Sequence, residues 1–279
     1  MILAVNAKEY RQAAALAYSI KTKNQNANVS LIVSKLDDVS DHWLEPFESV
    51  VELPFVSSEV RRTNDWQLYW ATPYDYTIAI DCKSLVKENH DQLWDYLTEN
   101  YEICFPYNAI NFDGVDLNNT DRSVYKTEYH LDILHSNMFY FKKDSDAALR
   151  YFKMADPYMR NWKTAFAKHF APQHVTLEYD QDIMHMLVAA CVGQDVSPVH
   201  RNVFKYIDME ISRDDGVIGR WNRWTDRLNT WASRDGKIKI QNFAINHTLY
   251  YGEDEFLTTE IFEEQKNHYR TVTKKINEL

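Results

Sequence analysis

The chain has 279 residues, of which 45% are hydrophobic and 26% are charged. This composition supplies a sizeable core and excludes disordered and collagen-like proteins. The 31 Lys and Arg residues against 41 Asp and Glu residues give a net charge of −10, which disfavours a strongly cationic polymer-binding protein.

The three cysteines form no CxxC pair, which argues against a disulfide framework or a cysteine zinc site. The apolar runs are shorter than the roughly 20 residues of a membrane-spanning helix, and the N-terminus has no charged leader before an apolar stretch. We therefore expect a protein with no membrane span, in the cytoplasm or, for a viral protein, in the host cytoplasm.

The first part of the chain alternates segments typical of strands and helices. Apolar or β-branched runs predict strands at residues 1–7, 28–35, 49–55 and 76–86. Segments rich in helix formers predict helices between and after them, at residues 8–25, 66–75 and 90–100. This order predicts an α/β fold with a mixed, mainly parallel sheet and helices on both faces.

The second part begins with a polar, turn-rich stretch at residues 107–123. Further strands are expected at 136–143 and 237–245, and helices at 144–170, 180–192 and 256–275. With no repeat or linker, we expect one domain over 1–279, with a nucleotide-binding half (1–105) and an acceptor half (106–279).

Ligands of such sheets bind outside the carboxyl ends of the strands, which here places Asn6, Ala7 and residues 81–84 at the expected site. The string TPYDYTIAIDCKSLV (72–86) resembles nucleotide-sugar-dependent glycosyltransferases of the GT-A fold, particularly the glycogenin-like and related viral or bacterial ones. In that family a helix and a Pro-Tyr-Asp turn lead into a strand that ends in Asp-x-Asp.

Other parts of the chain resemble the same family in the expected order. Residues 1–21 resemble its opening strand and helix, LHSNMFYFKK (134–143) its "NSG" strand and EYDQDIMHMLV (178–188) its "DQD" helix, and His247 stands where a third metal ligand is often found. The resemblance implies a GT-A-like enzyme that transfers a hexosyl or pentosyl group from a nucleotide diphosphate sugar to an unidentified acceptor.

The Asp-x-Asp position here reads Asp81-Cys82-Lys83. A departing diphosphate needs positive charge, often a Mg²⁺ or Mn²⁺ ion held by oxygen ligands, and Asp81 can supply one such ligand. Lys83 cannot, because a charged ammonium only donates. Either a metal is held by Asp81 and His247, or Lys83 itself meets the diphosphate.

The resemblance also implies roles for several polar residues. Asp180 and Asp182 are candidates for the carboxylate that faces the reacting sugar or acceptor, although either could simply cap a helix. His185, three residues after Asp182, is the expected hydrogen-bond partner of Asp182.

The donor contacts are expected at Asn6, Ala7 and Asn137, with Arg61 and Arg62 reaching the phosphates or the sugar. Asn6 could instead only end its strand, and adjacent arginines are often just solvated.

The acceptor is open between a glycan, a protein, a lipid and a nucleic acid base. The Trp- and Arg-rich segment 220–234 is either packed in the core or an acceptor surface, and a modified base would be tested there first. A non-catalytic protein that binds nucleotide sugars or glycans is the rival hypothesis, because Asp-x-Asp is altered. A nucleotidyltransferase ranks last, because no Gly-rich loop follows the first strand.

Overall fold

The computed structural model describes residues 1–55, 61–86, 89–107, 110–111, 122–176, 178–193, 196–200, 206–208, 248–250 and 259–277. Within these ranges a seven-stranded sheet has the order β3-β2-β1-β4-β8-β6-β9. Its strands are β1 (Ile2–Ala4), β2 (Ser30–Val33), β3 (Ser49–Glu52), β4 (Tyr76–Asp81), β6 (Ile103–Tyr107), β8 (Met138–Lys142) and β9 (Ser197–His200).

Strands β3, β2, β1 and β4 run parallel to one another, as do β6 and β9. Strand β8 is antiparallel to both of its neighbours, β4 and β6. The mixed, mainly parallel sheet that the strand-helix alternation predicts is therefore confirmed. The carboxyl ends of β1 and β4 lie side by side, because Leu3 pairs with Asp81.

A second sheet has the order β5-β11-β10-β7, with β5 (Ser84–Val86), β11 (Thr248–Tyr250), β10 (Tyr206–Asp208) and β7 (Ile110–Asn111). The expected single strand 76–86 is thus two strands in two sheets. They separate at a turn through Cys82, where the Asp81 side chain accepts a hydrogen bond from the Lys83 backbone N–H at 2.8 Å. An aspartate that bonds the backbone two residues on is a typical turn former.

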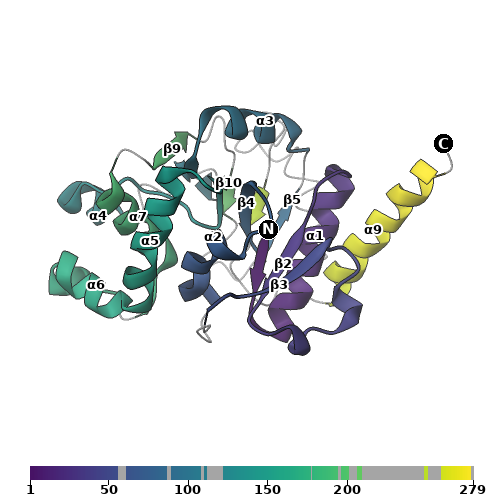
Figure 1. Cartoon of the computed structure of the whole chain (residues 1–279), viewed down its shortest axis with the longest axis horizontal. Helices are drawn as coiled ribbons and strands as arrows, with labels where there is room; N and C mark the ends of the chain where they lie inside the picture. The colour runs from purple at the N-terminus through teal and green to yellow at the C-terminus, as the bar shows by residue number, and fades with distance from the viewer. Residues whose placement is uncertain are drawn as a thin grey trace, which may run out of the picture.

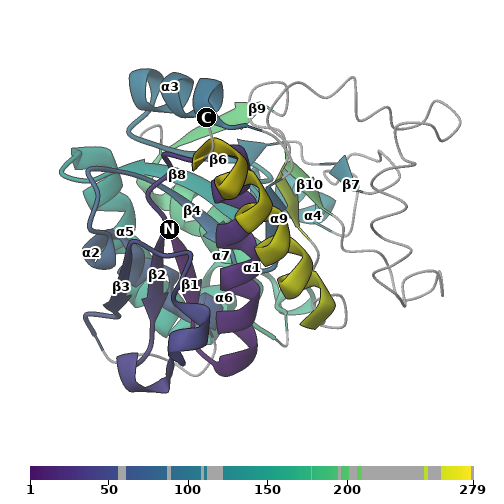
Figure 2. The ribbon, with the colours of Figure 1, turned by 90° about the vertical axis from the view of Figure 1, so that its right-hand side faces the viewer.

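Helices cover both faces of the large sheet (Figure 1). On one side lie α1 (Ala7–Lys23), α3 (Asp91–Asn100) and, packed along α1, α9 (Thr259–Asn277) (Figure 2). The other side holds the short α2 (Leu68–Ala71), α4 (Ser123–Tyr129), α5 (Asp146–Arg160), α6 (Trp162–His169) and α7 (Gln181–Val192). Short 3₁₀ helices are η1 (Leu36–Asp38), η2 (Asp41–Trp43), η3 (Arg61–Gln67) and η5 (Pro172–His174).

Two differences from the expected helices have local causes. The aromatic helix expected at 66–75 is the end of η3 followed by α2, which stops at Ala71, two residues before Pro73. The helix expected at 144–170 is two helices, because Asn161 leaves the helical region with φ −117° and ψ 39°. No helix in the described ranges combines the length and apolarity needed to cross a membrane.

Strand alternation divides the core into two clusters, one on each face of the sheet. Leu3, Ala79 and Phe139 face the cluster that includes α2, α5 and α7. Ile80 and Met138 face the cluster under α1 and α3. Because Asp81 is two residues beyond Ala79, its side chain follows Ala79 toward the layer of α7.

Candidate functional site

Asp81 ends β4 at the point where the sheet meets η3 and α7. Only 6% of its surface is exposed, and its backbone N–H donates to the carbonyl of Asn137 at 2.7 Å. Asn137, which the sequence predicts to contact the nucleotide-sugar donor, thus lies next to Asp81. Both Asp65 and Gln181 line a small cavity of about 20 Å³ beside the Asp81 carboxylate. The carboxylate is therefore buried beside a small cavity, whose lining combines the polar residues Asp65, Ser136 and Gln181 with apolar side chains.

A buried hydrogen-bond network connects this cavity to helices α5 and α7. The Asp65 carboxylate accepts a hydrogen bond from Nε2 of Gln181 at 2.5 Å and lies 3.2 Å from Nε2 of His185. The Tyr151 hydroxyl and Nδ1 of His185 are 2.5 Å apart. Oε1 of Gln181 is buried without a hydrogen-bond partner among the described residues. The adjoining cavity has room for one water, which would donate a hydrogen bond to this oxygen.

The expected bond between His185 and Asp182 is therefore wrong. His185 lies on the face of α7 that packs against α5, where Tyr151 takes one ring nitrogen and Asp65 the other. Spacing along one helix could not predict these partners, because they belong to other elements.

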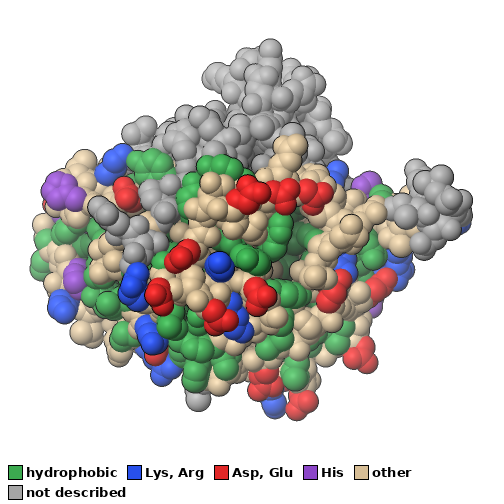
Figure 3. All heavy atoms as spheres, turned by 45° about the horizontal axis from the view of Figure 1, so that its top comes forward, with side chains coloured by type: hydrophobic (Ala, Val, Ile, Leu, Met, Phe, Trp, Pro, Cys, Tyr) green, Lys and Arg blue, Asp and Glu red, His purple; other side chains and the backbone are tan. Residues whose placement is uncertain are grey.

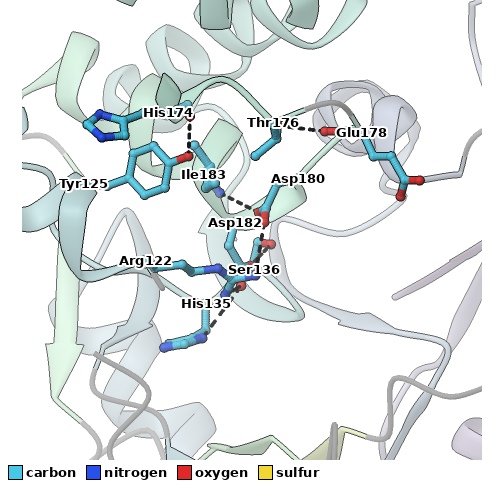
Figure 4. Close-up of polar contacts among 10 residues, drawn as sticks. All are labelled: Arg122, Tyr125, His135, Ser136, His174, Thr176, Glu178, Asp180, Asp182 and Ile183. Carbon is cyan, nitrogen blue, oxygen red and sulfur yellow. Dashed lines mark hydrogen bonds and ion pairs between the residues drawn. The ribbon is translucent and has the colours of Figure 1, made fainter. Parts of the chain in front are cut away.

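Asp182 is held in an ion pair instead (Figure 4). Its Oδ2 lies 2.5 Å from Nη1 of Arg122, and its Oδ1 accepts hydrogen bonds from Ser136 through the backbone N–H at 2.8 Å and the hydroxyl at 2.5 Å. Nδ1 of His135 is 3.8 Å away. Burial alone would raise the pKa of Asp182, but Arg122, His135 and Ser136 together hold this pKa below its usual value. Asp182 therefore remains a carboxylate at neutral pH.

Asp180 caps α7, because its side chain accepts the backbone N–H of Ile183 at 3.0 Å. This is one of the two roles that the sequence allows for it. Its other oxygen lies 3.4 Å from Nη2 of Arg122, so the guanidinium connects Asp180 to Asp182 (Figure 4). The Asp180 side chain is 25% exposed and the Asp182 side chain 6%. Asp180 is thus the carboxylate of the pair that a ligand reaches more easily.

Asn6 and Ala7 follow β1 and are exposed. Asn6 is the N-cap of α1, and its side chain accepts hydrogen bonds from the backbone N–H groups of Lys8 and Glu9, both at 3.1 Å. The helix N-terminus at this strand end is the type of place where a phosphate binds. Contact with a donor stays a prediction for both residues.

Arg61 and Arg62 begin η3, in front of Asp65, and their side chains lie outside the described residues. His247 and the segment 220–234 also lie outside them. In the described part of the chain, no group of three or more His, Cys, Asp or Glu residues is placed to hold a metal ion. Coordination of a metal by Asp81 and His247 stays a prediction.

The sequence assigned no role to five residues of the site. Asp65 and Arg122 were not singled out at all, and His135, Ser136 and Gln181 stood only within the quoted motif strings. A signal existed for Asp65, a carboxylate inside the aromatic stretch NDWQLYW, where a charge needs a buried partner. Arg122 carried no such signal, since it ends a polar loop.

Comparison with solved structures identifies the class of fold as that of GT-A glycosyltransferases. The chain is similar to the galactosyltransferase LgtC in complex with donor and acceptor sugar analogues, with a TM-score of 0.52 and 12% identity over 95% of this chain and 94% of LgtC. It is also similar to the bifunctional glycosyltransferase WbbM, with a TM-score of 0.51 and 14% identity over 96% of this chain and 50% of WbbM.

A third similar structure is the glycosyltransferase GlyE of Streptococcus pneumoniae TIGR4, with a TM-score of 0.51 and 8% identity over 98% of this chain and 61% of GlyE. No family model matches the sequence, and no curated protein matches it. The chain therefore has a GT-A glycosyltransferase-like fold, as its resemblance to this family predicts.

Proposed function

We propose that this protein is a glycosyltransferase that moves a sugar from a nucleotide diphosphate sugar to an acceptor. The observation on which the proposal rests is the group of polar side chains at the carboxyl end of β4, where Asp81, Asp65 and Gln181 line one small cavity. Ligands of open α/β sheets bind at this end of the strands. The GT-A fold shared with LgtC over nearly the whole chain supports the proposal.

The donor would lie across the ends of β1 and β4. The base would contact Asn6 and Ala7, and the diphosphate would lie near the α1 N-terminus, where the helix dipole favours negative charge. Arg61, Arg62 and Lys83 would supply further positive charge to the phosphates.

The mechanism would be positioning of the donor and electrostatic stabilisation of the departing diphosphate. We assign the cation to Lys83, because it stands where the second carboxylate of Asp-x-Asp would be, in the turn directly after Asp81. Asp81 would hold the turn that presents Lys83, through its 2.8 Å hydrogen bond to the Lys83 backbone. A divalent ion, where one is bound with the help of His247, would supply the same charge.

The two carboxylates at the start of α7, Asp180 and Asp182, would then have different roles. Asp182 is a weak base, because its pKa lies below the usual value and Arg122 occupies one of its oxygens. Its role would be to hold Arg122. Asp180, the more exposed of the two carboxylates, would face the reacting sugar or the acceptor and accept a hydrogen bond from its hydroxyl.

The test is turnover of UDP-, GDP-, ADP- and dTDP-sugars by the purified protein, with EDTA and with added Mn²⁺. We expect release of the nucleotide diphosphate, unchanged by EDTA and reduced at least about a hundredfold in Lys83→Ala, the loss typical of a removed transition-state donor. Loss of activity in EDTA and its recovery with Mn²⁺ would show that a metal ion, and not Lys83, stabilises the departing diphosphate. Absence of turnover and of binding for every donor would refute the proposal.

A binding protein without turnover is the second candidate, favoured by the replacement of the second Asp-x-Asp carboxylate with Lys83. It predicts donor binding that Asp81→Ala weakens, and no release of nucleotide by the wild type. The acceptor, whether glycan, protein, lipid or nucleic acid base, is left open.

A further inference from the structure

A larger cavity lies on the other face of the sheet. Its volume is about 540 Å³, and its walls are β4, the start of β8, the end of α1 and the beginning of α3. Figure 3 shows the surface hollowed near the centre of this face, below a row of acidic side chains. The volume falls in the range of roughly 300 to 1,000 Å³ that small-molecule sites occupy.

This cavity opens on the opposite face of β4 from the small cavity at Asp81, and the linings of the two share Met1 and Ile80. Ile78 and Ile80 contribute to its floor. Alternation along β4 turns these side chains away from the face to which Ala79 and Asp81 point. A ligand here would therefore not compete with a donor at Asp81.

The floor of the cavity is apolar and the rim is polar. The floor is formed by Ile20, Val29, Ile78, Ile80, Val86 and Met138. Two aromatic side chains stand at the rim, Trp94 at 38% exposure and Tyr76 at 37%. Such rings pack against flat, weakly polar surfaces such as the C–H faces of sugars.

The polar groups of the rim are suited to hydroxyls. Asn26, Asn28 and Asp75 are exposed, and their side chains make no hydrogen bond to the described residues. The Asp91 carboxylate accepts one hydrogen bond, from the Asn89 amide at 2.9 Å. Amides donate and accept, and carboxylates accept, so together they match a ligand with several hydroxyl groups.

The charge of the lining excludes anionic ligands. Among the described residues the lining holds two carboxylates, Asp75 and Asp91, and no Lys or Arg. A phosphate or a nucleotide diphosphate would meet these two carboxylates, while the Lys142 ammonium, 5.6 Å from the centroid of the Tyr76 ring, is outside the lining.

We propose that this cavity binds a neutral saccharide, with C–H faces against the apolar floor and the two aromatic rings, and hydroxyls at the amides and carboxylates of the rim. The site lies away from the chemistry at Asp81 and would anchor a glycan rather than transform it. The proposal does not depend on the assigned transferase activity.

The experiment measures binding of maltotriose, cellotriose and lactose to the full chain by saturation-transfer NMR titration. At least one of the three should bind saturably, and an excess of UDP should not displace it. Trp94→Ala should weaken this binding about threefold to tenfold, the range expected for one ring contact. The double variant Asn28→Ala, Asp75→Ala should also weaken it, so the test does not depend on the folding of one variant.

Tyr96→Ala is the matched control, because Tyr96 is on the same helix, is also 38% exposed and does not line the cavity. It should bind like the wild type, and so should Asp81→Asn. Failure of all three saccharides to bind, equal binding by the wild type and both cavity variants, or displacement by UDP would overturn the proposal. None of these binding results depends on whether the protein turns over a nucleotide-sugar donor, so this proposal and the proposed function are tested separately.

Discussion

At the scale of single residues, the Asp182 carboxylate is the most strongly constrained charge of the candidate site. It is almost fully buried, and three hydrogen bonds from Arg122 and Ser136 compensate the loss of water. Removing one partner of a buried pair leaves the other charge without compensation, which costs more than the pair itself contributes. Arg122 is 28% exposed, so water moderates this cost.

We therefore expect Asp182→Asn to lower the free energy of unfolding by about 2 kcal/mol at pH 7. The folded-state pKa of Asp182 lies below the unfolded value of about 4, so its contribution is present above pH 4 and lost as the pH falls further. Denaturant unfolding between pH 7 and pH 3 measures this. The difference between wild type and variant should narrow at the acidic end.

Asp180→Asn is the control for this prediction. Asn also caps helices well, and Asp180 lies 3.4 Å from Arg122 against 2.5 Å for Asp182. The Asp180 variant should therefore lose less than about 1 kcal/mol. If the Asp182 variant differed from wild type equally at pH 3 and pH 7, the ion pair would not be the cause.

At the scale of elements, helix α1 begins at the strand end that the donor is proposed to use. Asn6 caps this helix, and Asp caps equally well while adding a negative charge. Asn6→Asp should keep the melting temperature within about 2 °C but weaken donor binding, because the new carboxylate would repel a diphosphate. Melting curves with and without donor measure both effects.

Asn6→Ser is the companion variant, because serine also caps and is uncharged. It should bind donor better than Asn6→Asp. Equal donor binding by both variants would show that Asn6 only caps α1 and does not lie near the bound diphosphate.

Helix α9 packs on α1 and η2 around the buried ring of Phe262, and its Tyr269 ring also lies 5.4 Å from that of Tyr18. Phe262 is fully buried, with its centroid 4.8 Å from that of Trp43 and 5.8 Å from that of Tyr18. Phe262→Ala should lower the free energy of unfolding by about 3 to 4 kcal/mol, the cost of emptying such a site.

Arg270→Ala is the comparison on the same helix. Arg270 bonds Glu45 at 2.8 Å, but both side chains are exposed, so the loss should be below about 1 kcal/mol. Chemical denaturation of both variants gives the values. Similar losses would show that α9 is attached by its surface charges and not by the Phe262 ring.

The elements also show how far sequence could predict the fold. Helix α7 and strand β4 were predictable, because a local run of apolar residues and their end signals define each of them. The antiparallel insertion of β8 between β4 and β6 was not, since strand pairing is decided by contacts far apart in the chain. The turn after Asp81 divided a strand that its residue types alone would continue.

At the scale of the whole molecule, sequence also predicts only those parts of the site that local segments define. Asp81 could be predicted because it ends a buried strand, and Asp180 because it precedes an apolar helix. Asp65 and His185 are 120 residues apart and meet only when η3 packs on α7. No spacing along the chain encodes this contact, so the network behind Gln181 became visible only in the fold.

At the scale of the whole molecule, we propose that a nucleotide diphosphate sugar binds at the carboxyl ends of β1 and β4, next to Asp81. A ligand that binds only the folded state raises its stability, by about 2.7 kcal/mol at one hundred times its dissociation constant. For a chain of this size this corresponds to a rise in melting temperature of several degrees.

The most direct test is therefore thermal unfolding of the wild type and Asp81→Ala with UDP-, GDP-, ADP- and dTDP-sugars. We predict that at least one donor raises the melting temperature of the wild type by several degrees and that of Asp81→Ala by much less. No rise with any donor, or the same rise in both proteins, would contradict the assignment of the donor site.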